Sequence, residues 1–136
     1  MKNIAISLAL ALFLAACSSG SSVSDIPPLD ISGLYTGEFE SSNGLDEGVV
    51  TLNIQEDNTG TIGGNLILEF DRNDPSCIVN GVIAGSRSGF NVQLATGQIS
   101  FALTASADGS VLSGTYVPIG EGCSNASGAG TLTVTR

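Results

Sequence analysis

The sequence predicts an all-β fold, an antiparallel up-and-down barrel of about eight strands. From residue 31 onward, apolar and polar residues alternate in short runs, which places every second side chain on one face of a strand. Glycine, asparagine and aspartate separate these runs and are typical of turns. No stretch beyond residue 31 has the apolar spacing of a helix.

The turn residues divide this region into successive short strands. Asp57-Asn58-Thr59-Gly60 predicts one turn, and Asp108-Gly109 is a strong hairpin signal. In the fourth strand we expect Ile78, Val82 and Ala84 to share the inward face, and Phe90 to point inward at the start of the fifth. The expected strands are 31–40, 48–56, 61–70, 77–86, 90–94, 99–105, 111–117 and 128–136.

The short connections favour a meander of antiparallel strands. Eight such strands can close into a barrel whose interior is filled by side chains, and closure removes exposed strand edges. A two-sheet sandwich is the alternative, because the same alternation of residues serves both architectures.

The N-terminus has the features of an export signal. Lys2 is followed by an almost wholly apolar run over residues 4–13, too short for a membrane-spanning helix. The sequence Leu14-Ala15-Ala16-Cys17 resembles the lipobox of bacterial lipoproteins. The resemblance implies that residues 1–16 are removed and that Cys17 carries a diacylglycerol and a further acyl chain such as palmitate.

Residues 17–30 are rich in serine, glycine and proline, and this composition indicates a flexible tether to a single domain over residues 31–136. Because Ser18 and Ser19 follow the cysteine, the lipoprotein resemblance implies an outer-membrane location in a Gram-negative source. In a Gram-positive source the protein would sit on the single membrane.

The mature chain is strongly acidic. It keeps 13 acidic residues against three arginines, so its net charge is −10. Without a basic patch, nucleic acid is excluded as a partner, and membrane attachment must come from the lipid. Cys77 and Cys123 are the remaining cysteines of an exported small domain, and we expect them to form a disulfide.

Two short motifs resemble the lipocalin and avidin-like meander barrels. Gly33-Leu34-Tyr35 is similar to their Gly-x-Trp start, with tyrosine in place of tryptophan, and 113–116 (Ser-Gly-Thr-Tyr) resembles a motif near their end. The resemblance implies a barrel over residues 31–136. The chain has no tryptophan, so the aromatic walls of the avidin site are missing and no binding residue is carried over.

The residue types of most active sites are missing. The chain has no histidine, and its single lysine lies in the signal peptide. Glu38 and Glu40, which share a strand face, are interpreted as solvated charges. Residues 71–74 (Asp-Arg-Asn-Asp) do not fit a calcium loop, because Pro75 and Ser76 stand where a ligand and a glycine belong. We therefore expect no enzyme, metal or cofactor.

The barrel interior is the remaining candidate site. Its apolar side chains are expected either to pack as an ordinary core or to hold a small apolar ligand. Two functions follow, namely a non-enzymatic interaction or structural module of the envelope, or a lipocalin-like carrier. The expected lining is Tyr35, Phe39, Leu52, Ile54, Leu66, Phe70, Val82, Phe90, Phe101, Leu103, Leu112 and Tyr116, whose six aromatic residues are the candidate ligand contacts.

Overall fold

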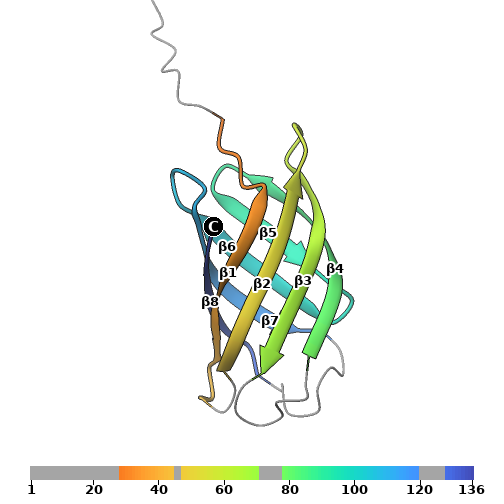
Figure 1. Ribbon diagram of the computed structural model, residues 1–136, viewed down its shortest axis with the longest axis vertical. Helices are drawn as coiled ribbons and strands as arrows, with labels where there is room; N and C mark the ends of the chain where they lie inside the picture. The colour runs from red at the N-terminus through yellow and green to blue at the C-terminus, as the bar shows by residue number, and fades with distance from the viewer. Residues whose placement is uncertain (1–27, 45–46, 71–77, 120–127) are drawn as a thin grey trace, which may run out of the picture.

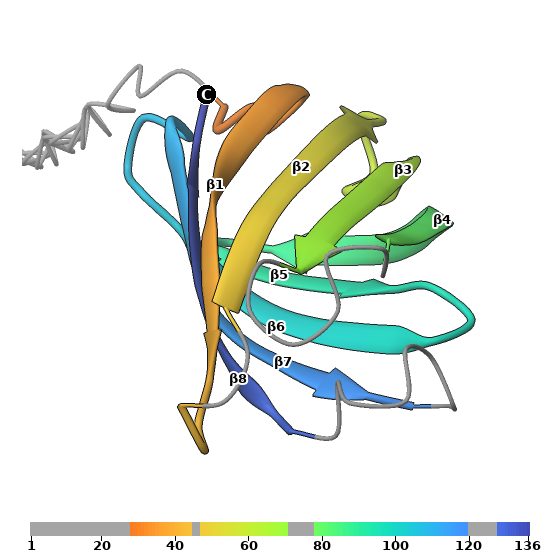
Figure 2. The same cartoon turned by 60° about the horizontal axis from the view of Figure 1, so that its bottom comes forward.

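The computed structural model describes residues 28–44, 47–70, 78–119 and 128–136. Within them, eight antiparallel strands follow one another round a closed barrel (Figures 1 and 2). The predicted barrel is confirmed, and the sandwich alternative is wrong. The strands are β1 (Gly33–Ser41), β2 (Glu47–Glu56), β3 (Thr61–Phe70), β4 (Ile78–Ser88), β5 (Asn91–Ala95), β6 (Ile99–Ala105), β7 (Val111–Pro118) and β8 (Gly130–Thr135).

The barrel closes where the first strand meets the last. β1 pairs with β8 over six residue pairs, from Thr36 opposite Thr135 to Ser41 opposite Gly130. The end at which β1 starts also holds the C-terminus and the β2–β3, β4–β5 and β6–β7 turns, and we call it the closed end (Figure 1). The opposite end is called the far end.

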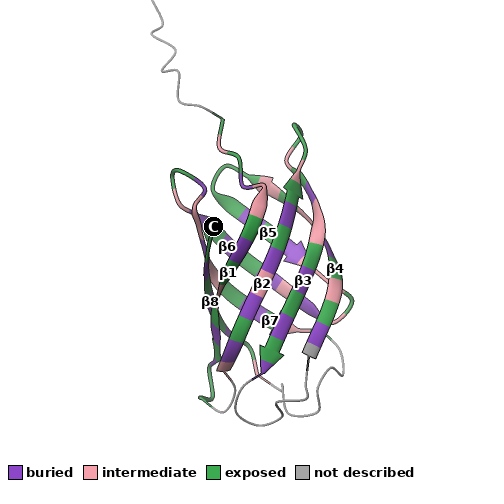
Figure 3. Ribbon diagram, in the orientation of Figure 1, coloured by how far each residue is buried: buried purple, intermediate pink, exposed green. Residues whose placement is uncertain are grey.

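Alternating residues of each strand point into the barrel, and burial follows this alternation (Figure 3). In β2, for example, Val50, Leu52 and Ile54 are buried as expected. One cluster of apolar side chains thus forms the core: Ile31, Tyr35, Phe39, Val50, Leu52, Ile54, Ile62, Leu66, Leu68, Phe70, Val79, Ile83, Val92, Leu94, Ile99, Phe101, Leu103, Ala105, Leu112, Tyr116, Leu132 and Val134.

The predicted inward face of β4 is wrong. Val79 and Ile83 are buried, whereas Val82 is 74% exposed and Ala84 is also exposed. The side chain of Ile78, the third residue expected inside, lies outside the described residues. The inward-facing residues of β4 are therefore shifted by one position relative to the prediction, so the face predicted to point inward points outward.

Complementary size across the β3–β4 pair explains this orientation. Leu66 lies opposite Gly81, and Ile62 lies opposite Gly85. Ile83 in turn lies opposite Gly64, so each of these three large residues lies opposite a glycine of the other strand. The other face of β4 would have placed the polar Asn80 inside the core.

Phe90 does not line the interior. It lies in the two-residue turn between β4 and β5, where Gly89 adopts a φ of 60°, and its side chain is 52% exposed. The turn falls one residue later than predicted, so β5 begins at Asn91. Phe90 is therefore not part of the interior lining, and its predicted inward placement is wrong.

Two closed-end turns are organised by aspartate side chains. Asp57 accepts hydrogen bonds from the Thr59 hydroxyl and from the backbone N–H of Thr59 and Thr61. Asp108 accepts from the hydroxyls of Ser106 and Ser110 and from the Ser110 N–H. These bonds favour the charged carboxylate and lower the pKa of both groups below their ordinary value of 3.8.

Because both pKa values are lower in the folded state, these aspartates stabilise the barrel above pH 3.8 and lose that contribution as the pH falls through the folded values. We expect the urea midpoint to fall between pH 5 and pH 2. The Asp57→Asn/Asp108→Asn variant should show a smaller fall. A variant that keeps the whole wild-type pH dependence would contradict this assignment.

Candidate functional site

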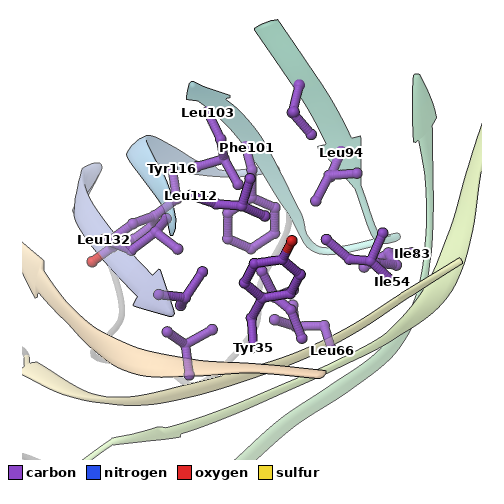
Figure 4. Close-up of a cluster of buried hydrophobic side chains, with 14 of the residues drawn as sticks. Tyr35, Ile54, Leu66, Ile83, Leu94, Phe101, Leu103, Leu112, Tyr116 and Leu132 are labelled. Carbon is purple, nitrogen blue, oxygen red and sulfur yellow. The ribbon is translucent and has the colours of Figure 1, made fainter. Parts of the chain in front are cut away.

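The interior aromatic residues pack against one another. The rings of Phe39 and Phe70 meet edge to face with centroids 4.9 Å apart, and Phe39 meets Tyr116 in the same way at 5.8 Å. Edge-to-face contacts at these distances are favourable beyond the area that they bury. Figure 4 shows buried side chains, Phe101 and Tyr116 among them, pointing into the barrel from the surrounding strands.

Tyr35 has a polar group in the core, and the backbone satisfies it. Its hydroxyl oxygen lies 2.6 Å from the Gly109 carbonyl oxygen and 3.0 Å from that of Ile31, so it can donate to either. Burial raises the pKa of this hydroxyl, which therefore remains a donor. The residue links β1 to the β6–β7 turn and to the segment before β1, a structural role.

An ion pair at the closed end ties the segment before β1 to the barrel. Arg87 Nε donates to Glu56 Oε1 at 2.5 Å, and the two side chains are 18% and 4% exposed. Arg87 also donates to the carbonyls of Leu29 and Gly89. Glu56 Oε2 in turn accepts the Ile31 N–H. Arg87 therefore connects β4 to β2 and to residues 29–31.

Arg136 makes a second connection at this end. Its guanidinium carbon lies 5.8 Å from the centroid of the Tyr35 ring, within the range of a cation–π contact. Its Nη1 donates to the Ser32 carbonyl at 2.6 Å and to the Asp30 carbonyl at 3.3 Å. Two of the three arginines of the chain thus hold residues 29–32 across the closed end.

A polar groove of about 430 Å³ runs along the outer wall where β1 meets β8. Glu38 lies opposite Thr133, and Glu40 lies opposite Thr131. Hydroxyl groups donate and accept hydrogen bonds, whereas carboxylates only accept, so this lining suits a partner with N–H or O–H donors. The outward-facing side chains of this threonine groove are Thr36, Glu38, Glu40, Thr131, Thr133 and Thr135.

A second groove, of about 320 Å³, lies on the outer wall of β4–β7. Its floor is built from small side chains such as Ala84, Ala95 and Ala102. Val117 lies beside them and is 50% exposed. The groove therefore differs from the threonine groove, because no outward-facing ionisable side chain lines it.

Several expectations fall on residues that the structure does not describe. Cys17, the proposed lipid site, and the Cys77 and Cys123 pair lie outside the described residues. Within the described ranges, no group of three or more Asp, Glu, Cys or His side chains is arranged to hold a metal ion. The described residues also form no helix long and apolar enough to cross a membrane.

The six aromatic residues predicted to contact a ligand do not all lie inside the barrel. Tyr35, Phe39, Phe70, Phe101 and Tyr116 lie inside the barrel, and Phe90 lies outside it. The sequence did not predict the roles of Arg87 and Arg136. The low number of arginines in the chain was the signal that could have drawn attention to them. The sequence also did not predict the outer grooves, whose signal was the uneven charge: residues 75–135 contain only Arg87, Asp108 and Glu121 as charged residues.

Comparison of the chain with protein-family models, with curated proteins and with solved structures gave no match.

Proposed function

We propose that the chain is a lipid-anchored, non-enzymatic interaction module of the bacterial envelope, which binds its partner through its outer wall. The lipobox over residues 14–17 supports the anchor. The packing of the aromatic core supports the use of the outer wall: Phe39, Phe70 and Tyr116 contact one another where a carrier would hold its ligand. That packing is the observation that carries the proposal.

The closed end would face the membrane. The described chain begins at Pro28 beside this end, and ten residues separate Cys17 from Pro28. Ten residues span at most about 35 Å when fully extended, so the lipid would hold the closed end near the bilayer. The threonine groove and the far end would then be accessible to other envelope components.

The threonine groove is the surface that we assign to this partner. The carboxylates of Glu38 and Glu40 require hydrogen-bond donors on the other side, and the threonine hydroxyls can accept from such donors as well. A polar envelope partner rich in N–H or O–H groups meets this requirement. The proposal includes a Cys77–Cys123 disulfide, because the strands next to both cysteines, β4 and β8, begin at the far end.

The anchor predicts a clear difference between the wild type and Cys17→Ser. We expect the wild type in the membrane fraction, with an N-terminal cysteine whose mass includes acyl chains. Cys17→Ser, exported behind a signal peptide that is cut without lipidation, should carry no acyl mass and should leave the membrane fraction. In the same samples, Cys77 and Cys123 should resist alkylation until they are reduced. A mature wild type without acyl mass would refute the anchor.

The packed core predicts the result of native mass spectrometry on the exported protein. We expect the mass of the processed chain and its covalent lipid, with no further apolar molecule. A bound small molecule that is lost when the barrel unfolds would instead identify a carrier. This measurement is independent of the anchor, because Cys17→Ser can be examined in the same way.

A further inference from the structure

The outer wall of β4–β7 lacks charge throughout the described residues. The ionisable side chain of β4, Arg87, belongs to the inward-facing set and binds Glu56. We call this wall the uncharged face. Its outward-facing residues are Asn80, Val82, Ala84, Ser86, Ser88, Asn91, Gln93, Ala95, Ser100, Ala102, Thr104, Val111, Ser113, Thr115 and Val117.

The wall formed by β1–β3 is acidic by contrast. Glu38 and Glu40 of β1, Glu47 of β2 and Glu69 of β3 point outward. In the register of the sheet, Glu40 lies directly opposite Glu47. Among the described residues, these carboxylates thus lie on one side of the barrel, and the outward-facing side chains of β4–β7 are uncharged.

The uncharged face has both a groove and exposed apolar side chains. Ala84, Ala95, Ser100 and Val117 form one row across the four strands, because each is the register partner of the next. This row crosses the groove of about 320 Å³. Val117, which is 50% exposed, lines this groove, and Val82, which is 74% exposed, lies two residues before Ala84 on the same face of β4.

A strand edge with a shortened partner borders this face. β4 pairs with β3 through residues 78–86, but it pairs with β5 only through residues 84–88. Among the described residues, no strand pairs with the β5 side of residues 78–83, although the side chain of Thr96, which follows β5, lies close to Gly81. Proteins usually protect such edges with charged residues, and the outward-facing Asn80 and Val82 supply none.

We propose that the uncharged face is a self-association surface, on which a second copy of this chain packs through the same face. Two copies that met through β1–β3 would oppose like charges, whereas the uncharged face keeps the described outward carboxylates of both copies outside the contact. A two-fold axis would place the exposed Val82 and Val117 of each copy over the alanine floor of the other.

The distribution of charge favours a second copy of this chain over a different protein on this face. A partner recognised by charge would need opposite charges on this face, and depletion of charge is typical of the centre of an interface. The neutral surface that the structure itself provides is the same face of another copy. This inference goes beyond the proposed function, and it does not depend on the lipid anchor.

Sedimentation velocity of the full exported chain as Cys17→Ser tests the proposal. That substitution keeps every described residue and removes the site of the lipid that would gather copies in one micelle. We expect a concentration-dependent equilibrium between monomer and dimer. Val82→Glu should raise the dissociation constant about 100-fold, because each dimer would bury two unpaired carboxylates.

Leu34→Glu is the matched control, since Leu34 is 59% exposed on the acidic wall and should leave the dissociation constant unchanged. Val117→Glu provides a second test on the uncharged face if Val82→Glu does not fold, as judged by circular dichroism. A wild-type barrel that stays monomeric up to about 100 μM would overturn the proposal. Equal dimerisation of a folded Val82→Glu or Val117→Glu variant would also overturn it.

Discussion

Gly64→Ala is expected to destabilise the barrel by about 3 kcal/mol, which corresponds to a fall of about 12 °C in Tm. Gly64 faces inward on β3 between Ile54 of β2 and Ile83 of β4. A Cβ atom there would overlap the carbonyl oxygen of Asn53. The φ angle of Gly64 is also 149°, a conformation that residues with a Cβ adopt only under strain.

Gly63→Ala is the matched control, because the same change is made one residue away. Gly63 points outward, and a Cβ atom at this position would meet nothing within 4 Å. We expect it to leave stability unchanged or to raise it by up to about 1 kcal/mol, since alanine restricts the unfolded chain more than glycine does. Urea unfolding measures both variants. Equal stability of the two variants would show that the close packing around Gly64 does not contribute to the stability of the barrel.

Inward-facing glycines also explain why the sequence predicted the inward face of some strands and not of others. Strands such as β2 alternate strictly, with Val50, Leu52 and Ile54 on one side, and their inward face follows from the sequence. β4 has apolar residues on both faces, so alternation alone could not choose between them. The choice depends on Gly81 and Gly85, which lie opposite large residues of β3, and this pairing is known only from the register.

The predicted position of the turn before β5 was wrong for a related reason. The pattern placed the turn at residues 87–89, but Arg87 is drawn into β4 by its hydrogen bonds with Glu56 and Leu29. Gly89 takes the left-handed conformation that the turn requires, and Phe90 becomes the second turn residue. A side-chain contact distant in sequence thus set the local boundary, which local propensity cannot reveal.

The candidate site was less predictable than the fold. The aromatic residues of the core could be identified from alternation, because Tyr35, Phe39 and Phe101 belong to clearly alternating strands. The outer grooves could not, since each combines strands brought together by the register. Thr36 and Thr135 are about one hundred residues apart in the sequence and become direct neighbours only when β1 closes on β8.

The largest single-residue effect at the closed end is expected for Arg87→Met. It would leave the 4%-exposed Glu56 side chain without its cationic partner, and breaking a buried ion pair in this way typically costs about 3–5 kcal/mol. The carbonyls of Leu29 and Gly89 would lose their donor at the same time. Urea unfolding should show this loss together with earlier proteolysis of the segment before β1.

A double-mutant cycle separates the ion pair from the packing of the side chains. Glu56→Met combined with Arg87→Met removes both charges, and we expect this variant to be more stable than Arg87→Met alone. Arg87→Lys keeps the charge but loses the fork of donors that binds Glu56, Leu29 and Gly89 together, so it should recover only part of the stability. If the two methionine substitutions were instead additive, the pair would not act as a unit. The segment before β1 would then be held mainly by the burial of Ile31 and by Arg136, which binds the carbonyls of residues 30 and 32.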